Sequence, residues 1–460
     1  MGIVHLGLGA FYRAHGALYV EEAMAASGGH WGIVGVSLRS PATRDALAPQ
    51  GYAYTAVERR PDGSHPRVVE VLDHVLVAPE DPAGLIACLA HPGVRIVTLT
   101  VTEKGYCHEP ATGRLDLAHP DIIHDLADPL PRSAPGVLVR ALAARRAAGH
   151  RPFTVLTCDN LPHNGPLVRG VVLDLAQRID PGLADWIARE GRFPATMVDR
   201  IVPATTRDDI DALARQTGVL DLSPVVHEPF RQWVVEDDFV DGERPDLAAA
   251  GATLVADVTP FEDMKLRCLN GTHSALAYLG YLAGHETIAD TVADPSFAAY
   301  VKGLWANEIV PVLTPPPDTD LAAYCGQLFD RYANPAIRHR TWQIAMDGSQ
   351  KLPQRILATL DDSLAAGRVA PGLMLAVAGW MRYVGGVDEN GRPIDVRDPL
   401  ADRLRALCDG AADPADRVRA LLGVREVFAE PLAAALEPGI ITAYLRLVEL
   451  GARRAVEELS

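Results

Sequence analysis

Three polar side chains with complementary chemistry stand close together in the segment 261–280, FEDMKLRCLNGTHSALAYLG. Lys265 can give or take a proton, the amide of Asn270 can donate to an oxygen, and His273 adds an imidazole. At the period of an α-helix, about 3.6 residues per turn, the three residues fall within less than half of the circumference. One helix face would then handle a proton and a reacting oxygen together, as general acid–base catalysis requires.

An ordinary structural interpretation competes with this catalytic one. A lysine near a helix start often only extends its amine to solvent, and Asn and His in helices often bond locally. Glu262 and Asp263 suit the first turn of a helix, where the helix dipole favours negative charge. Gly271 would weaken a helix interior, so we expect another segment to pack closely against it. These residues alone favour the ordinary interpretation, and the rest of the chain must decide.

Composition limits the class of protein. The chain has 460 residues, more than one hydrophobic core normally organises, so two domains are expected. Hydrophobic residues make up 48% and charged residues 22%, which excludes a disordered chain, and the net charge of −16 disfavours nucleic-acid and anionic-membrane partners. The sequence has neither a signal peptide nor a long uncharged apolar run. Six scattered cysteines without a C-x-x-C pair indicate a reduced cytoplasmic protein with no zinc site.

The start of the chain has the pattern of a nucleotide-binding turn. Residues 2–6 are an apolar strand, Gly7 and Gly9 follow at once, and a helix is expected over 13–26. In this context G-x-G binds a dinucleotide, because the glycines let the backbone approach a pyrophosphate. The motif is partial, since Tyr12 stands in the place of the third glycine, and an ordinary βα turn is the alternative.

Polar residues follow several further strands. The expected second strand, 31–38, ends without the acid that commonly holds the ribose of NAD. Arg39 stands there instead; it would tolerate a 2′-phosphate or simply face solvent, so NAD is expected and NADP is not excluded. Thr102, Glu103 and Asn160 follow later strands. Open α/β sheets bind ligands at such carboxyl ends.

Strand patterns end near residue 257, and Ala, Leu and Arg at helical spacing dominate from there onward. We therefore expect an α/β fold with a Rossmann-type domain over 1–257, followed by a mostly α-helical domain over 258–460. The segment 339–354 is a polar-rich exception in the helical half, and its Lys351 is a cation available to an anionic substrate.

Six segments in one order resemble a known family. They are GLGAFYRAH, TEKGY, CDNLPHNG, MVDRI, the K-x-x-x-x-N-G-x-H of residues 265–273, and DGSQKLP. Over nearly the whole chain they are similar to the polyol-specific long-chain dehydrogenases, the mannitol dehydrogenase family. The resemblance implies an NAD(P)-binding domain, a helical second domain and hydride transfer without a metal. It also implies a small sugar acid or polyol as substrate, and we expect a monomer or small homo-oligomer. Relatives usually carry a segment before the first strand, so the true N-terminus is longer or that segment is absent here.

The resemblance also implies a role for each site residue. Lys265 would be the general acid/base, Asn160 and Asn270 would hold the reacting oxygen, and His273 would orient the substrate and the lysine. Asp199 would contact the substrate or tune the site, and the other expected substrate contacts are Lys351, Arg340 and Gln343. The expected cofactor contacts are Gly7, Gly9, Ala10, Phe11, Arg39, Thr102, Glu103 and Asn160.

Within the family, the segments HRTWQIAMDGSQKLPQR and AGWMRYVGGVDENG are most similar to the fructuronate reductase (D-mannonate oxidoreductase) branch. Mannitol 2-dehydrogenases tend to carry an Arg eight positions before Lys351, where this chain has Gln343. A uronate carboxylate needs a cation, and Arg338, Arg340 and Lys351 are the candidates. We therefore expect reduction of D-fructuronate to D-mannonate, with mannitol–fructose or D-arabinitol chemistry as the alternative. A non-catalytic nucleotide-binding protein is disfavoured, because it need not keep the Lys–Asn–His set.

Overall fold

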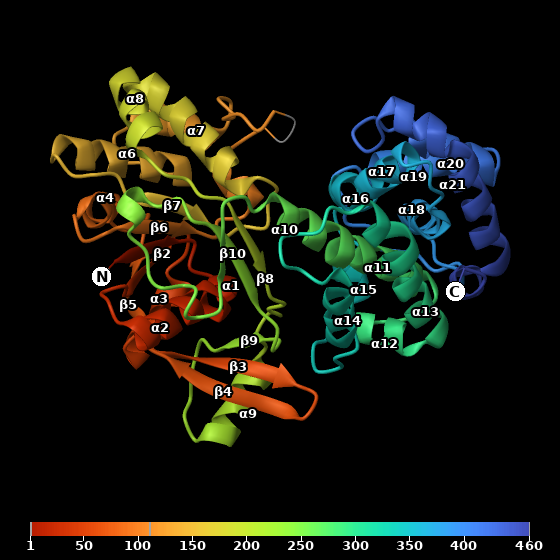
Figure 1. The fold of residues 1–460 in the computed structure, drawn as a ribbon, viewed down its shortest axis with the longest axis horizontal. Coiled ribbons are helices and arrows are strands. Elements are labelled where there is room, and N and C mark those ends of the chain that lie inside the picture. Colours follow the sequence, from red (N-terminus) through yellow and green to blue (C-terminus); the bar gives the residue numbers. More distant parts are fainter. Residues whose placement is uncertain (1, 110–111, 460) are drawn as a thin grey trace. The chain divides into compact units, whose positions relative to one another are not determined.

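The computed structural model describes residues 2–109 and 112–459, and the chain falls into two compact units, Met1–Thr259 and Pro260–Ser460 (Figure 1). The first unit is built on a parallel sheet and the second on helices. This arrangement confirms the expected fold class.

A five-stranded parallel sheet in the order β5-β2-β1-β6-β7 forms the centre of the first unit. Its strands are β1 (Ile3–Leu6), β2 (Ile33–Ser37), β5 (Leu72–Val77), β6 (Ile96–Leu99) and β7 (Thr154–Thr157). Ile3 in β1 pairs with Ile33 on one side and with Ile96 on the other. The order of the strands reverses between β1 and β6, which is the kind of position where doubly wound sheets bind nucleotides.

Helices cover both faces of this sheet. On one face Val4 and Leu6 belong to a core with α4 (Pro82–Ala90), α5 (Pro120–Ala127), α6 (Ala134–Ala147), α7 (Asn164–Ile179) and α8 (Pro181–Glu190). On the other face Ile3 packs with residues of α1 (Ala10–Ala14), α2 (Gly16–Ser27) and α3 (Ala42–Leu47). Because both faces are buried, the four strands β1, β2, β6 and β7 consist of buried and mostly apolar residues.

Two three-stranded sheets complete the first unit. One contains β4 (Gly63–Val69), β3 (Tyr54–Arg60) and β9 (Val225–His227), and the other contains β11 (Thr253–Val255), β10 (Gln232–Glu236) and β8 (Thr196–Asp199). Helix α9 (Arg207–Thr217) and three short 3₁₀ turns connect these parts: η1 (Ala48–Gln50), η2 (Glu103–Tyr106) and η3 (Val240–Gly242). Pro229 lacks an N–H for a ladder, and the chain divides into β9 and β10 around it.

Every named element of the second unit, within its described residues, is a helix. The α-helices are α10 (Thr259–Met264), α11 (Thr272–Leu282), α12 (Ile288–Ala293), α13 (Pro295–Gly303), α14 (Leu321–Tyr332), α15 (Thr341–Ile344), α16 (Gly348–Leu352), α17 (Ala358–Ala365), α18 (Pro371–Val384), α19 (Ala401–Gly410), α20 (Pro414–Leu422), α21 (Glu430–Leu450) and α22 (Ala452–Glu457). Three π-helical segments, η4 (Lys265–Gly271), η5 (Leu304–Ile309) and η7 (Pro353–Leu357), and the 3₁₀ turn η6 (Val310–Val312) join them.

Helix α18 lies at the centre of the second unit, buried over most of its surface between α11 and α21. Among the helices that the structure describes, α21 is the one that is long and apolar enough by composition to cross a membrane, with a mean hydropathy of 1.2. Its buried residues include Ala433, Leu436, Ile440 and Tyr444, spaced by three or four positions. That spacing is typical of a helix with one face against a protein core.

Candidate active site

The residues expected to contact the cofactor lie at one edge of the parallel sheet. Arg39 follows β2, the segment 7–11 follows β1, Thr102 and Glu103 follow β6, and Asn160 follows β7. Since these four strands are parallel neighbours, their carboxyl ends share an edge, and the loops after β1 and β6 flank the reversal of strand order.

The absence of a side chain has a different consequence at each of the two glycines after β1, Gly7 and Gly9. Gly7 has φ +89°, and a Cβ there would stand 2.2 Å from the carbonyl oxygen of Thr100, so a side chain does not fit where this turn meets the loop after β6. A Cβ on Gly9 would meet only the Gly7 carbonyl oxygen, at 3.8 Å. The backbone at Gly9 is thus open to close approach by a ligand.

Tyr12, which replaces the third glycine of the usual pattern, fills the space between helix and strand. Its ring stacks on the ring of His5 in β1, with centroids 3.4 Å apart and planes 4° from parallel. A Cβ on Gly16 would lie 2.5 Å from the Tyr12 ring. The close packing that the third glycine normally allows is therefore provided one turn later, and the single helix expected over 13–26 is divided at His15 into α1 and α2.

A buried chain of hydrogen bonds holds the backbone turn at Gly7. The Thr100 hydroxyl donates to the Gly7 carbonyl at 2.9 Å and lies 2.9 Å from His5 Nε2, while His5 Nδ1 lies 2.8 Å from the Thr98 hydroxyl. Because the single hydroxyl proton of Thr100 goes to Gly7, Nε2 must carry the His5 proton and Nδ1 must accept from Thr98. Burial lowers the pKa of His5 to about 3, which keeps the ring neutral.

Asp159 holds the loop that carries Thr102. Its carboxylate accepts the backbone N–H groups of Val101 at 2.9 Å and Thr102 at 3.0 Å, and the Tyr106 hydroxyl at 2.7 Å. Thr102 has φ +66°, an unusual conformation for a β-branched residue, and such strain needs firm support. Burial raises the pKa of Asp159 while these hydrogen bonds oppose the rise. No local sequence pattern reveals this role of Asp159.

Arg39, Glu103 and Asn160 are exposed at this edge. Arg39 makes no hydrogen bond or ion pair with any residue that the structure describes, so its guanidinium is available to a ligand phosphate.

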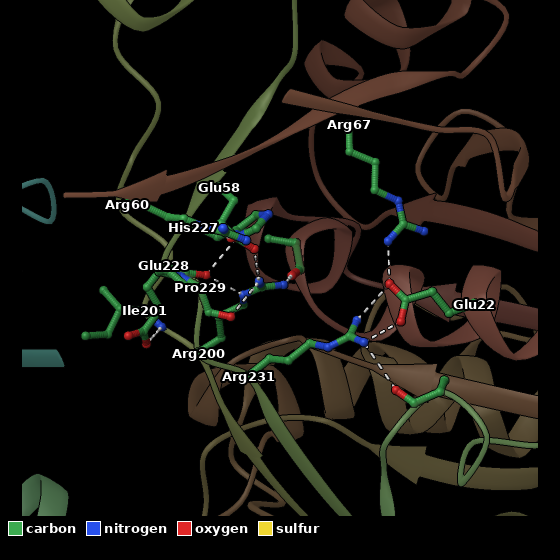
Figure 2. A network of polar contacts seen from close by, with 12 residues as sticks. Glu22, Glu58, Arg60, Arg67, Arg200, Ile201, His227, Glu228, Pro229 and Arg231 are labelled. Carbon is green, nitrogen blue, oxygen red and sulfur yellow. Dashed lines mark hydrogen bonds and ion pairs between the residues drawn. The ribbon is translucent and has the colours of Figure 1, made fainter. Parts of the chain in front are cut away.

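Asp199 ends β8 and is buried, and the next residue anchors that strand end. Arg200 donates to three main-chain carbonyls: Ala14 at 2.7 Å, Glu228 at 3.1 Å and Pro229 at 3.4 Å. Figure 2 shows Arg200 among Glu228, Pro229 and Glu58. Burial lowers the pKa of Arg200 to about 10. Because Ala14 ends α1, one guanidinium ties the helix after the glycine turn to the strand end that carries Asp199.

In the second unit, Lys265 and Asn270 belong to the π-helical segment η4, which joins α10 to α11. The expectation of regular α-helical spacing there is wrong. A π-helix bonds residue i to residue i+5, so residues five apart lie one above the other, and Lys265 and Asn270 are separated by that number of positions. The π-helical turn thus aligns the lysine with the amide more closely than an α-helix would. His273 follows within the first turn of α11.

Side chains from three other positions stabilise this unusual turn. Trp305 Nε1 donates to the Cys268 carbonyl at 2.8 Å, which also accepts the Thr272 hydroxyl at 2.6 Å. The Tyr332 hydroxyl donates to the Leu269 carbonyl at 2.9 Å. A change from α to π winding disturbs the regular carbonyl pairing of a helix, and these donors satisfy the carbonyls concerned.

Gly271 has the close neighbour that a glycine in a helix interior predicts. A Cβ there would stand 2.5 Å from the carbonyl oxygen of Arg355 in η7. Two π-helical segments therefore approach each other at the position of this glycine.

The proposed catalytic side chains are buried: Lys265 is 6% exposed, Asn270 8% and His273 6%. Asn270 Nδ2 has no hydrogen-bond partner among the described residues, so this buried donor is available to a substrate oxygen. The His273 ring stacks on Tyr332 with centroids 4.6 Å apart and meets the His339 ring edge-on at 4.9 Å. Burial, followed by His339 and Arg331, holds the pKa of His273 well below its usual value, so this imidazole is neutral.

The remaining expected substrate contacts lie in and before α15 and α16. Lys351 Nζ donates to the Met346 carbonyl at 2.6 Å, and burial lowers the Lys351 pKa to about 8. Burial, followed by the charges of Arg331 and Lys351, lowers the pKa of His339 to about 4, so the ammonium of Lys351 lies near His339. Arg340 and Gln343 are exposed, and Arg340 Nε is 3.8 Å from a carboxylate oxygen of Glu286. Across residues 2–109 and 112–459, no group of three or more His, Cys, Asp or Glu side chains is arranged to hold a metal.

Comparison with known proteins agrees with this division of the chain. Residues 1–249 match the mannitol dehydrogenase Rossmann domain, and residues 257–448 match the mannitol dehydrogenase C-terminal domain. The chain is 48% identical to the D-mannonate oxidoreductase of Escherichia coli K12, covering 99% of this chain and 95% of that protein.

Two mannitol 2-dehydrogenases are also similar. That of Aspergillus fumigatus is 40% identical over 94% of this chain and 87% of its own length. The structure of the Pseudomonas fluorescens enzyme with NAD and D-mannitol has 39% identity and a TM-score of 0.88, covering 100% of this chain and 94% of that one.

Proposed function

Because this chain belongs to the mannitol dehydrogenase family, we propose that it is an NAD-dependent oxidoreductase that reduces D-fructuronate to D-mannonate reversibly and without a metal. The observation that carries the proposal is the buried set Lys265, Asn270 and His273, with an unpaired amide donor on Asn270. A sugar acid is favoured over a neutral polyol by the identity to a D-mannonate oxidoreductase and by the polar segment 339–354. We further propose that it acts in the cytoplasm as a monomer or small homo-oligomer.

The first unit fits a dinucleotide. The open backbone at Gly9 permits close approach of a pyrophosphate, and the rigidly supported loops after β1 and β6 flank the reversal of strand order. When bound, NAD supplies the group that accepts or gives the hydride. Arg39 in place of the usual acid leaves NADP as a second cofactor to test.

The residues of the second unit would handle the proton and the oxygen. Lys265 would remove the hydroxyl proton in the oxidation direction and return it in the reduction direction. Asn270 Nδ2 would donate to the same oxygen and stabilise its developing negative charge without titrating. His273, neutral because of its burial, would orient the substrate by a hydrogen bond rather than act as an acid. Asn160 and Asp199 of the first unit remain proposed contacts.

Mannitol–fructose interconversion is the second candidate function. Its support is the 39% identity to a mannitol 2-dehydrogenase over the whole length of this chain. The absence of an arginine at Gln343 argues against it. A non-catalytic protein is disfavoured because all three residues of the Lys–Asn–His set are present and buried.

The test is NADH oxidation followed by absorbance, with D-fructuronate and D-fructose as separate substrates. We expect kcat/KM for D-fructuronate to exceed that for D-fructose by roughly two orders of magnitude or more. D-fructose has no carboxylate, so binding it would leave the polar group that recognises the carboxylate without a partner. A preference for D-fructose would replace the proposal with the second candidate. No turnover of either, with NADPH also tried, would reject both.

A further inference from the structure

One arginine beside the proposed catalytic residues lacks a counter-ion. Arg355 lies in η7, its side chain is half-buried, and the one hydrogen bond that it makes with the described residues runs from Nη1 to the Ser274 hydroxyl at 3.2 Å. Within the described residues, no carboxylate lies within ion-pair distance of its guanidinium. An arginine has five N–H donors in a fixed planar fork, so most of the donors of Arg355 remain unused.

Four other cations of this region have partners of different kinds. Arg338 and Arg340 both approach the carboxylate of Glu286 at the surface, and Arg267 of η4 pairs with Asp362. Lys351 donates to backbone carbonyls. A guanidinium withdrawn from water without an anion is costly, and burial accordingly lowers the pKa of Arg355. Among these five cations Arg355 and Lys351 lack a carboxylate partner, and Lys351 directs its ammonium to two backbone carbonyls whereas Arg355 makes one hydrogen bond with the described residues.

The position of Arg355 places its charge next to the substrate-handling residues. Ser274, its hydrogen-bond partner, directly follows His273, and the Arg355 charge contributes to the depressed pKa values of both His273 and His339. Three buried polar atoms around this group also lack partners among the described residues. They are Asn270 Nδ2, His339 Nδ1 and the Tyr278 hydroxyl.

We propose that Arg355 binds the carboxylate of the sugar-acid substrate and thereby makes the enzyme select sugar acids over neutral polyols. The inference rests on the proposed function and names the residue that recognises the charged end of that substrate. A guanidinium fork matches a carboxylate with two parallel hydrogen bonds, which gives both affinity and orientation. The carboxylate of a hexuronate lies at the opposite end of the carbon chain from the ketone, so its cation need not touch Lys265. Arg338 and Arg340, expected from the sequence as candidates, are exposed and share the single carboxylate of Glu286.

The experiment compares the full-length wild-type enzyme with Arg355→Gln and Arg355→Lys. The measured quantity is the ratio of kcat/KM for D-fructuronate to kcat/KM for D-fructose. For Arg355→Gln we expect this ratio to fall about 100-fold through the KM of the acid, the usual consequence of truncating a buried charge pair. Arg355→Lys should recover part of the loss, because it keeps the charge without the planar fork.

Arg267→Gln is the matched control, since Arg267 is a neighbouring, largely buried arginine that has its own carboxylate. Its ratio should stay within about twofold of wild type. Equal losses for D-fructuronate and D-fructose in Arg355→Gln would overturn the proposal, because a structural role affects both substrates alike.

A second measurement separates this inference from the proposed reaction. Binding of D-gluconate to the enzyme–NAD complex, followed by calorimetry, reports carboxylate recognition without turnover. The wild type could fail to reduce D-fructuronate but bind D-gluconate, while Arg355→Gln does not bind D-gluconate. In that case the proposed substrate is wrong and the role of Arg355 stands. If D-gluconate binds equally to both, or to neither, the role of Arg355 is refuted.

Discussion

Substituting Gly271 by alanine tests whether the contact between the two π-helical segments positions the active site. The new Cβ would stand 2.5 Å from the Arg355 carbonyl oxygen, about 0.9 Å inside the 3.4 Å at which ordinary contacts begin. The obstructing atom is backbone within a helix, so it cannot move by a side-chain rotation. Overpacking of this kind costs typically about 1–3 kcal/mol, and the upper end applies to a backbone obstacle. The better helix propensity of alanine offsets about 1 kcal/mol, leaving a net loss of about 2 kcal/mol.

The shift should also lower turnover. A displacement near 1 Å between η4 and η7 moves Asn270 and His273 relative to Arg355, and misplacement on that scale can reduce kcat roughly 100-fold. NADH affinity should stay within about twofold of wild type, because the glycine turn belongs to the other unit. Urea unfolding followed by tryptophan fluorescence gives the stability, and steady-state kinetics give kcat.

Gly326→Ala provides the control for helix propensity. Gly326 lies inside α14, and nothing stands within 4 Å of a Cβ built there. This variant should gain up to about 1 kcal/mol without loss of activity. If Gly271→Ala matches Gly326→Ala in both stability and kcat, the close approach of η7 does not constrain η4 and the reasoning is refuted.

Three further outcomes are expected. Lys265→Ala should lower turnover by several orders of magnitude while NADH binding, measured by fluorescence, persists; normal turnover would remove the lysine from the mechanism. The KM for D-fructuronate should rise as pH passes through 8, because the pKa of Lys351 is lowered to about 8 and its ammonium charge is present below that pH and lost above it. Lys351→Arg should remove this rise, and an unaltered pH profile in that variant would exclude Lys351 as its source. Prolonged EDTA treatment should leave activity intact, and a loss restored by a divalent ion would contradict the metal-free proposal.

Much of the first unit could be predicted because most strands of its parallel sheet can be recognised from the residues of the strand itself. β1, β2, β6 and β7 are short apolar runs, each followed by polar or glycine residues, and the sheet places those residues along one edge. The hairpin of β3 and β4 escaped prediction, since β4 is largely polar and exposed and β3 ends in the charged run Glu58–Arg60. Two positioning residues were also missed. Asp159 and Arg200 act through backbone groups that are distant in sequence, and no local pattern reveals such partners.

The second unit shows more clearly which features cannot be predicted from the sequence. The residue types at Lys265, Asn270 and His273 indicated the chemistry, and Gly271 indicated a close neighbour, which Arg355 provides. The π-helical winding could not be foreseen, because a periodicity argument assumes α-helical spacing from the outset. The significance of Arg355 comes from a missing counter-ion, and that is a property of three-dimensional surroundings alone.

The π-helical turn at η4 has a consequence for the evolution of this enzyme. Each residue of an α-helix advances the chain by about 100°, so two residues four positions apart are offset by only about 40°. Deleting one codon between Lys265 and Asn270 would give them that spacing, and the segment could return to regular α-helix with both side chains still on one face. The π-helical turn thus accommodates one extra residue while it keeps the lysine and the amide aligned. One codon could therefore be gained or lost at this place on the same scaffold without separating the two groups.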